Sequence, residues 1–247
     1  MGADVPSSWV LAPPLPGVAR TSQPQYPVAP APYALTRGLK SLILPSVRWD
    51  MVAGPITQVG AGVFRPTEKG RSYFLQSQVT GTQRLDVNAT AFSQPTAWTV
   101  IALVRSTYGS LLQYIANVNW NGSTVPMALC IGGRGAMDGA SFYNGSWAGS
   151  GKTTDIRGDN KWHVVAGTAG PSGILCYYID GVLDKSAAGT PSFGSANANP
   201  LTWANYLDDI APFQGDFALG AAFNTELSAA EVKDYSDNPW QVFANDY

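Results

Sequence analysis

Residues 162–184 constrain the fold of this chain more than any other segment. Two short apolar runs, residues 162–167 and 174–179, flank a turn at Pro171-Ser172-Gly173. Asp180-Gly181 follows, and its glycine supplies the positive φ angle that a tight type I′ hairpin turn requires. Three short strands joined by two turns form an antiparallel meander, which is the building unit of a β-sandwich.

The composition agrees with one large, turn-rich β domain. The 247 residues include 26 glycines, 18 prolines and only three glutamates, whereas helical proteins favour Glu, Lys and Leu. Fifteen lysines and arginines nearly balance 17 aspartates and glutamates, so no basic field exists for nucleic acid or an anionic membrane. We expect no transmembrane helix and no secretory signal, because no long apolar run and no positively charged start are present.

Residues 1–34 are predicted to form an extended arm, because residues 1–33 hold eight of the 18 prolines and each proline removes a backbone donor. Trp9, Leu11 and Tyr26 are apolar anchors along this arm. Two interpretations stay open: a disordered tail, or an arm that orders against a neighbouring subunit. The globular domain is expected over residues 35–247.

Further strands are predicted where apolar runs lie between turn signals, at residues 42–44, 73–75, 85–87, 98–105, 111–118, 127–131, 140–143 and 213–223. Residues 98–105 are apolar on both faces, which favours the centre of a sheet. One short helix is predicted from the capping box of Ser228 and Glu231, and it must end before Pro239. We therefore expect an all-β, two-sheet antiparallel sandwich of jelly-roll type with one short C-terminal helix.

Cys130 and Cys176 each lie within an apolar run. Cysteine often behaves as a small core hydrophobe, so two free, buried thiols are expected in preference to a disulfide. The sequence does not decide their state.

Four segments in the same order resemble the laminin-G-like, concanavalin A-like sandwich family: residues 98–105, 161–165, 175–181 and 224–232. The resemblance covers roughly residues 70–243 and implies a lectin–glucanase type of fold. Residues 35–39, which follow the proline-rich start, and the Asn-Pro-Trp segment at 238–243 are similar to laminin-G-like proteins of tailed bacteriophages. Those proteins are usually structural components of the virion, so this resemblance implies a particle component.

Catalytic patterns are missing from the sequence. Glucanases of this fold carry Glu-x-Asp-x-x-Glu on one strand, and none of Glu68, Glu226 and Glu231 has a neighbour at that spacing. Asp208 and Asp209 are adjacent, so on a strand they would point to opposite faces. His163 is the sole histidine and lies within a strand motif, which favours a structural role, and no zinc constellation exists. We expect no enzymatic activity.

Two loops invite ligand interpretations that the sequence does not support. Residues 149–154 suggest a phosphate loop, but Ser146 stands where the motif needs glycine, so a solvated loop is expected. Two acidic groups could provide calcium ligands: Asp155, Asp159 and Asn160, and Asp208, Asp209 and Asp216. Turn formation explains the acidic residues equally well, so no cofactor is expected, and calcium stays possible but unsupported.

Aromatic side chains in loops rich in asparagine and glycine are typical of glycan or partner contacts. The candidate contact residues are Trp120, Asn121, Tyr143, Asn144 and Trp147. Packing of these loops against the sandwich or against a neighbouring subunit would explain them as well.

The expected function is that of a non-enzymatic bacteriophage virion structural protein, made in the host cytoplasm. It would act in head decoration, as a tail adaptor or beside a fibre, with the arm anchored on capsid or tail subunits and the protein homo-oligomeric in the particle. The alternative is a carbohydrate- or receptor-binding module at a tail or head-fibre tip. A polysaccharide-degrading enzyme is the least favoured class.

Overall fold

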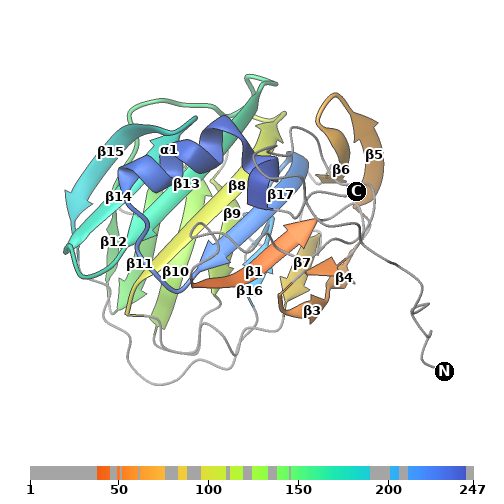
Figure 1. Ribbon diagram of the computed structural model, residues 1–247. Coiled ribbons are helices and arrows are strands. Elements are labelled where there is room, and N and C mark those ends of the chain that lie inside the picture. The colour runs from red at the N-terminus through yellow and green to blue at the C-terminus, as the bar shows by residue number, and fades with distance from the viewer. Residues whose placement is uncertain are drawn as a thin grey trace.

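Two antiparallel β-sheets packed face to face form the domain, as the computed structural model shows (Figure 1). The structure describes residues 38–44, 49–50, 52–60, 62–75, 83–87, 96–109, 112–118, 124–132, 138–144, 146–189, 201–205 and 211–242. The predicted all-β sandwich with one short C-terminal helix is confirmed. The predicted arm lies outside the described residues.

Among the described residues, ten strands form the larger sheet. Its main order is β15 (Val182–Ala188), β14 (Ile174–Ile179), β13 (Trp162–Ala169), β8 (Trp98–Ser106), β17 (Gly215–Phe223), β1 (Leu39–Leu44), β2 (Trp49–Asp50) and β3 (Gly54–Pro55). At one end of β17, β6 (Gly70–Leu75) pairs with it, and β5 (Val63–Thr67) pairs with β6.

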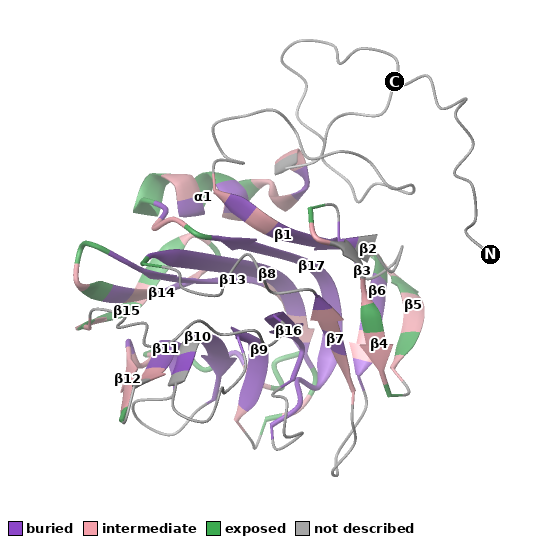
Figure 2. Ribbon diagram, turned by 90° about the horizontal axis from the view of Figure 1, so that it is seen from below, coloured by how far each residue is buried: buried purple, intermediate pink, exposed green. Residues whose placement is uncertain are grey.

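The smaller sheet contains seven described strands. Their order is β12 (Trp147–Gly149), β11 (Gly139–Asn144), β10 (Thr124–Ile131), β9 (Gln113–Val118), β16 (Leu201–Trp203), β7 (Arg84–Val87) and β4 (Thr57–Val59). Figure 2 shows the two sheets as separate layers, with buried residues lining the space between them.

The main core fills the space between the sheets. Trp98, Trp203 and Phe217 are fully buried there, and the rings of Trp203 and Phe217 lie 5.5 Å apart. Burying each such ring stabilises the fold by roughly 1.5–3 kcal/mol. Gly167 on β13 keeps the layers close, because a Cβ atom there would lie 2.9 Å from the Ala140 methyl group.

A second apolar cluster covers the outer face of the larger sheet. Helix α1 (Ala229–Asp237) and the 3₁₀ turn η5 (Pro239–Val242) lie across this face (Figure 1). The predicted capping box is present, since Ser228 and Glu231 bond each other reciprocally at the helix start. Strand β8 is therefore buried on both faces, with Val100 in the main core and Leu103 beneath the helix. No described helix is long and apolar enough to cross a membrane.

The meander from β13 to β15 is confirmed. Asp180 and Gly181 have φ angles of 51° and 76°, the two positive values of a type I′ turn. Both cysteines are free thiols on the outward faces of different sheets. Cys130 is buried as predicted, whereas Cys176 is only half-buried at the margin of the helix-side cluster.

Candidate functional site

Tyr143 and Trp147 form an aromatic pair at one edge of the smaller sheet. They are direct partners across the hairpin of β11 and β12, and their ring centroids lie 5.4 Å apart in an edge-on arrangement. Both side chains are half-buried. Their neighbours Phe142 and Ala148 pack on the main core, so the two rings face outward from the sandwich.

A small apolar cluster holds this aromatic pair in place. The pair packs against a buried group on the outward face of the smaller sheet: Tyr114, Val125, Ala128, Cys130 and Ala211. Because the base of the pair is fixed by packing, its remaining exposed surface is a preformed aromatic platform. Such a platform can contact the apolar face of a ring-shaped ligand.

A row of polar side chains lies on the same face of the smaller sheet, and two of them, Asn117 and Thr202, are fully buried. In the register of the sheet, Asn117 lies opposite Thr202, which lies opposite Asp86. The Thr202 hydroxyl donates to Asp86 at 2.9 Å, and Arg84 forms an ion pair with Asp86 at 3.0 Å. The Asn117 amide donates to the Asn205 carbonyl, while its Oδ1 atom is buried without a hydrogen bond among the described residues.

The other predicted contact residues are not tested. Trp120 and Asn121 lie outside the described residues, as do the arm anchors Trp9, Leu11 and Tyr26. Asn144 ends strand β11, but its side chain is not described. These assignments stay predictions.

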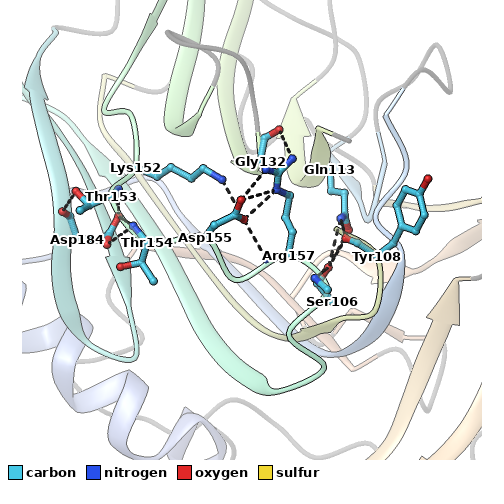
Figure 3. Close-up of polar contacts among 11 residues, drawn as sticks. Ser106, Tyr108, Gln113, Gly132, Lys152, Thr153, Thr154, Asp155, Arg157 and Asp184 are labelled. Carbon is cyan, nitrogen blue, oxygen red and sulfur yellow. Dashed lines mark hydrogen bonds and ion pairs between the residues drawn. The ribbon is translucent and has the colours of Figure 1, made fainter. Parts of the chain in front are cut away.

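The loop that suggested a phosphate site is occupied by a carboxylate of the chain itself (Figure 3). The backbone N–H groups of Thr153 and Thr154 donate to the Asp184 carboxylate at 2.6 and 3.0 Å. The loop does gather amides around an anion, as phosphate loops do, but the anion is supplied by β15. Residues 149–154 are therefore a loop fastened to the sheet and not a freely solvated one.

Asp155 is engaged in ion pairs and so is a poor calcium ligand. Its carboxylate contacts the Arg157 guanidinium at 2.6 Å and the Lys152 ammonium at 3.1 Å (Figure 3). The hydrogen bonds from Arg157 hold the pKa of Asp155 well below its usual range. Arg157 also donates to the Gly132 carbonyl at 3.3 Å, which ties the loop to the end of β10.

A second polar group in Figure 3 joins the same loop to the rim of the sandwich. The Gln113 side chain donates to the Tyr108 carbonyl at 2.7 Å and accepts from the Gln214 backbone at 3.0 Å. Ser106 accepts from the backbone N–H of Gly158 at 3.3 Å. These hydrogen bonds hold the loop and the strand ends together, so they support the fold.

His163 lies between two carboxylates that the sequence did not identify as its partners. Its Nδ1 atom is 2.7 Å from Asp180, and its Nε2 atom is 2.9 Å from Asp159. The hydrogen bond with Asp180 is the main cause of the raised pKa of His163, to which Asp159 also contributes. Asp180 further accepts from the Val164 backbone at 2.9 Å, so this cluster fastens the meander turn to β13.

The remaining calcium candidates are only partly described. Asp208 and Asp209 lie outside the described residues. Asp216 is fully buried, and it accepts from Arg65 at 2.6 Å, Arg105 at 2.8 Å and the Ser72 hydroxyl at 2.7 Å. Within the described part of the chain, no three His, Cys, Asp or Glu side chains are arranged to hold a metal ion.

Comparisons with known proteins agree with this architecture. The model of a laminin G family, described as the Concanavalin A-like lectin/glucanases superfamily, matches residues 79–233. No curated protein sequence matches the chain.

Several solved structures share the fold at low sequence identity. One is domain 4 of AbnA, an extracellular arabinanase from Geobacillus stearothermophilus, solved with arabinotriose. It is 15% identical to this chain with a TM-score of 0.66, and the match covers 80% of this chain and 98% of that domain. The binding domain of botulinum neurotoxin DC, solved with SialylT, is 13% identical with a TM-score of 0.62, and the match covers 83% of this chain and 52% of the toxin domain. The same toxin domain solved with rat synaptotagmin II is 14% identical with a TM-score of 0.60, and the match covers 81% of this chain and 51% of the toxin domain. The chain thus spans about half the length of the toxin domains.

Proposed function

We propose that this chain, which belongs to the concanavalin A-like lectin/glucanase superfamily, acts as a carbohydrate-binding module without catalytic activity. The observation that carries the proposal is the aromatic pair of Tyr143 and Trp147, fixed by packing and partly exposed on the outward face of the smaller sheet. Sugar-binding sites commonly combine an aromatic platform with a few placed polar groups. On the same face Arg84 and Asp86 keep partly exposed polar side chains, whereas Asn117 and Thr202 are fully buried.

Two similar structures support this assignment by what they contain. The arabinanase domain was solved with arabinotriose, and one toxin binding domain with SialylT. Both share the sandwich with this chain, and at 13–15% identity that likeness concerns the fold. Support for sugar binding by this chain therefore rests mainly on its own aromatic pair.

The glutamates favour binding over hydrolysis. Glycosidases of the usual type need two carboxyl groups flanking one bond. Glu231 belongs to the helix cap, Glu226 accepts from the Ser172 backbone at 3.1 Å, and Glu68 lies 3.4 Å from Arg105. Each carboxylate is engaged by a different part of the fold.

Glycan binding by the full chain tests the proposal. The protein is applied to a glycan array, and hits are measured by isothermal titration calorimetry. Trp147→Ala is expected to abolish binding of at least one of these glycans while the domain stays folded, as checked by its melting temperature. Val182→Ala is the matched control, because Val182 is 64% exposed on β15 of the larger sheet, whereas the pair belongs to the smaller sheet. A blank array, or equal binding by both variants, would refute the proposal.

We further propose that the module belongs to a bacteriophage particle, with residues 1–34 as the anchoring arm and the protein homo-oligomeric there. This rests on the proline-rich composition of the arm and on the resemblance of residues 35–39 and 238–243. Changing Trp9, Leu11 and Tyr26 together to alanine should leave glycan binding intact and prevent co-sedimentation with particles. Unchanged incorporation would contradict the anchoring role.

A further inference from the structure

A cavity of about 340 Å³ lies on the opposite side of the molecule from the aromatic pair. Its floor is the outer face of the larger sheet, and its roof is the C-terminal end of α1 with η5. The residues that matter for its chemistry are Trp162, Trp240, Lys69, Asp180, Asp237 and Asn238. Its volume is at the small end of the usual range for small-molecule sites, roughly 300–1,000 Å³.

The walls of this cavity are fixed before any ligand arrives. Trp240 is buried in the helix-side cluster, and Trp162 packs at its margin. The Arg105 guanidinium lies 5.1 Å from the centre of the Trp162 ring, and Arg105 is itself held by Asp216. Two indole rings from distant parts of the chain thus line one preformed space.

Polar groups at the rim provide both donors and acceptors. Asp180, Asp237 and the Asn238 side chain offer oxygen acceptors, and the Lys69 ammonium offers donors. The carboxylates already have basic partners, because Asp180 contacts His163 and Asp237 contacts Lys233. The rim is therefore rich in hydrogen-bonding groups and close to neutral.

We infer that this cavity is a second carbohydrate site, which takes one or two units of a neutral sugar. The apolar face of a pyranose ring suits the indole walls, and its hydroxyl groups can donate to the carboxylates and accept from Lys69. Because the cationic and anionic side chains around the rim balance, the cavity offers no net charge that would hold a cationic or an anionic ligand. The inference does not depend on the sheet-face site, because the two sites share no residue.

The test uses the full chain carrying Trp147→Ala, so that the sheet-face site is removed. Glucose, galactose, mannose and their neutral disaccharides are titrated by ligand-observed NMR and tryptophan fluorescence. Glucuronic acid and glucosamine are the charged counterparts of glucose. We expect at least one neutral sugar to bind and the charged counterparts to bind about tenfold more weakly, a difference of about 1.4 kcal/mol.

Further variants locate the binding. Asp237→Ala should weaken binding at least tenfold, because it removes a charged hydrogen-bond acceptor from the rim. It should leave the fold intact, since the Asp237 side chain is 60% exposed. Trp162→Leu should remove the fluorescence response and the binding together, with the melting temperature as the folding control.

Three outcomes would overturn the inference. These are no binding of any neutral sugar to the Trp147→Ala protein, unchanged affinity in Asp237→Ala, or charged sugars that bind as tightly as glucose. If the wild type bound a neutral sugar and the Trp147→Ala protein bound none, the sheet-face proposal would stand and the proposal of a second site would be refuted.

Discussion

The buried carboxylate of Asp216 fastens the β5–β6 hairpin to the centre of the larger sheet, and its removal provides a quantitative test. Arg65 and Arg105 each donate two hydrogen bonds to it, and Ser72 donates a fifth. Burial alone would raise the pKa of Asp216, but the hydrogen bonds from Arg65, Ser72 and Arg105 outweigh it and lower the pKa. Asp216→Asn keeps the shape of the side chain but removes the buried counter-ion of both arginines, and Arg105 keeps only the exposed Glu68.

The expected loss follows from the exposure of the two arginines. Removing one partner of a buried ion pair typically costs about 3–5 kcal/mol. The Arg65 side chain is 37% exposed and can regain water, whereas that of Arg105 is 18% exposed and cannot do so fully. We therefore expect about 3 kcal/mol, which corresponds to a fall in melting temperature of roughly 6–12 °C for a domain of this size.

Glu68→Gln is the matched control, because Glu68 contacts the same Arg105 from a side chain that is 61% exposed. An exposed ion pair contributes about 0–1 kcal/mol. Urea unfolding of both variants at pH 7 measures the difference. The stabilisation by Asp216 should persist above the ordinary aspartate value of about 3.9 and disappear as the pH falls through its lowered pKa. A loss of under about 1 kcal/mol for Asp216→Asn, equal to that of the control, would refute this account.

Three other predictions concern stability and reactivity. His163 has a raised pKa, so its stabilising contribution is complete below the ordinary histidine value of about 6.5 and is lost as the pH rises through the folded-state value. The difference in melting temperature between wild type and His163→Gln should therefore shrink with rising pH. Gly132→Ala should cost roughly 2–4 kcal/mol in urea unfolding, because its Cβ would lie 1.9 Å from Arg157 Cδ at a φ of +71°. Gly151→Ala, at a similar φ but with its Cβ in ordinary contact with Lys185 Cγ at 3.7 Å, should cost only about 1 kcal/mol. A thiol reagent should label half-buried Cys176 in the native protein and reach Cys130 only on unfolding, since burial raises the pKa of Cys130.

Local patterns predicted the local elements well. The turn at Asp180-Gly181 and the helix cap at Ser228 depend on neighbouring residues, and both are present. The apolar run at residues 98–105 indicated a central strand, and β8 is central because β13 and β17 pair with its two edges. No local pattern indicated that β17 lies between β8 and β1 in the larger sheet. These strands are far apart in the sequence, so their pairing depends on the topology of the whole domain.

The two candidate sites also differ in whether a local sequence pattern could predict them. Tyr143 and Trp147 belong to one hairpin, so their spacing along the chain brings them together. The cavity joins the β5–β6 turn, β8, β13, the β14–β15 turn and the end of α1, so its parts have no common sequence pattern. The partners of His163 were equally hidden, although Asp159 is only four residues away, because a loop folds it back toward the imidazole ring.

The pairing of β1 with β17 has a consequence for the order in which the chain folds. Residues 39–44 leave the ribosome well before their main partner strand, which spans residues 215–223. The centre of the larger sheet therefore cannot close until synthesis of the domain is nearly complete, and such non-local closure slows folding. Until then β1 and β8 each keep an unpaired edge with free backbone donors and acceptors, which favours aggregation of the incomplete chain. Truncation before residue 215, which removes β17, should consequently yield an aggregating product and not a smaller folded domain.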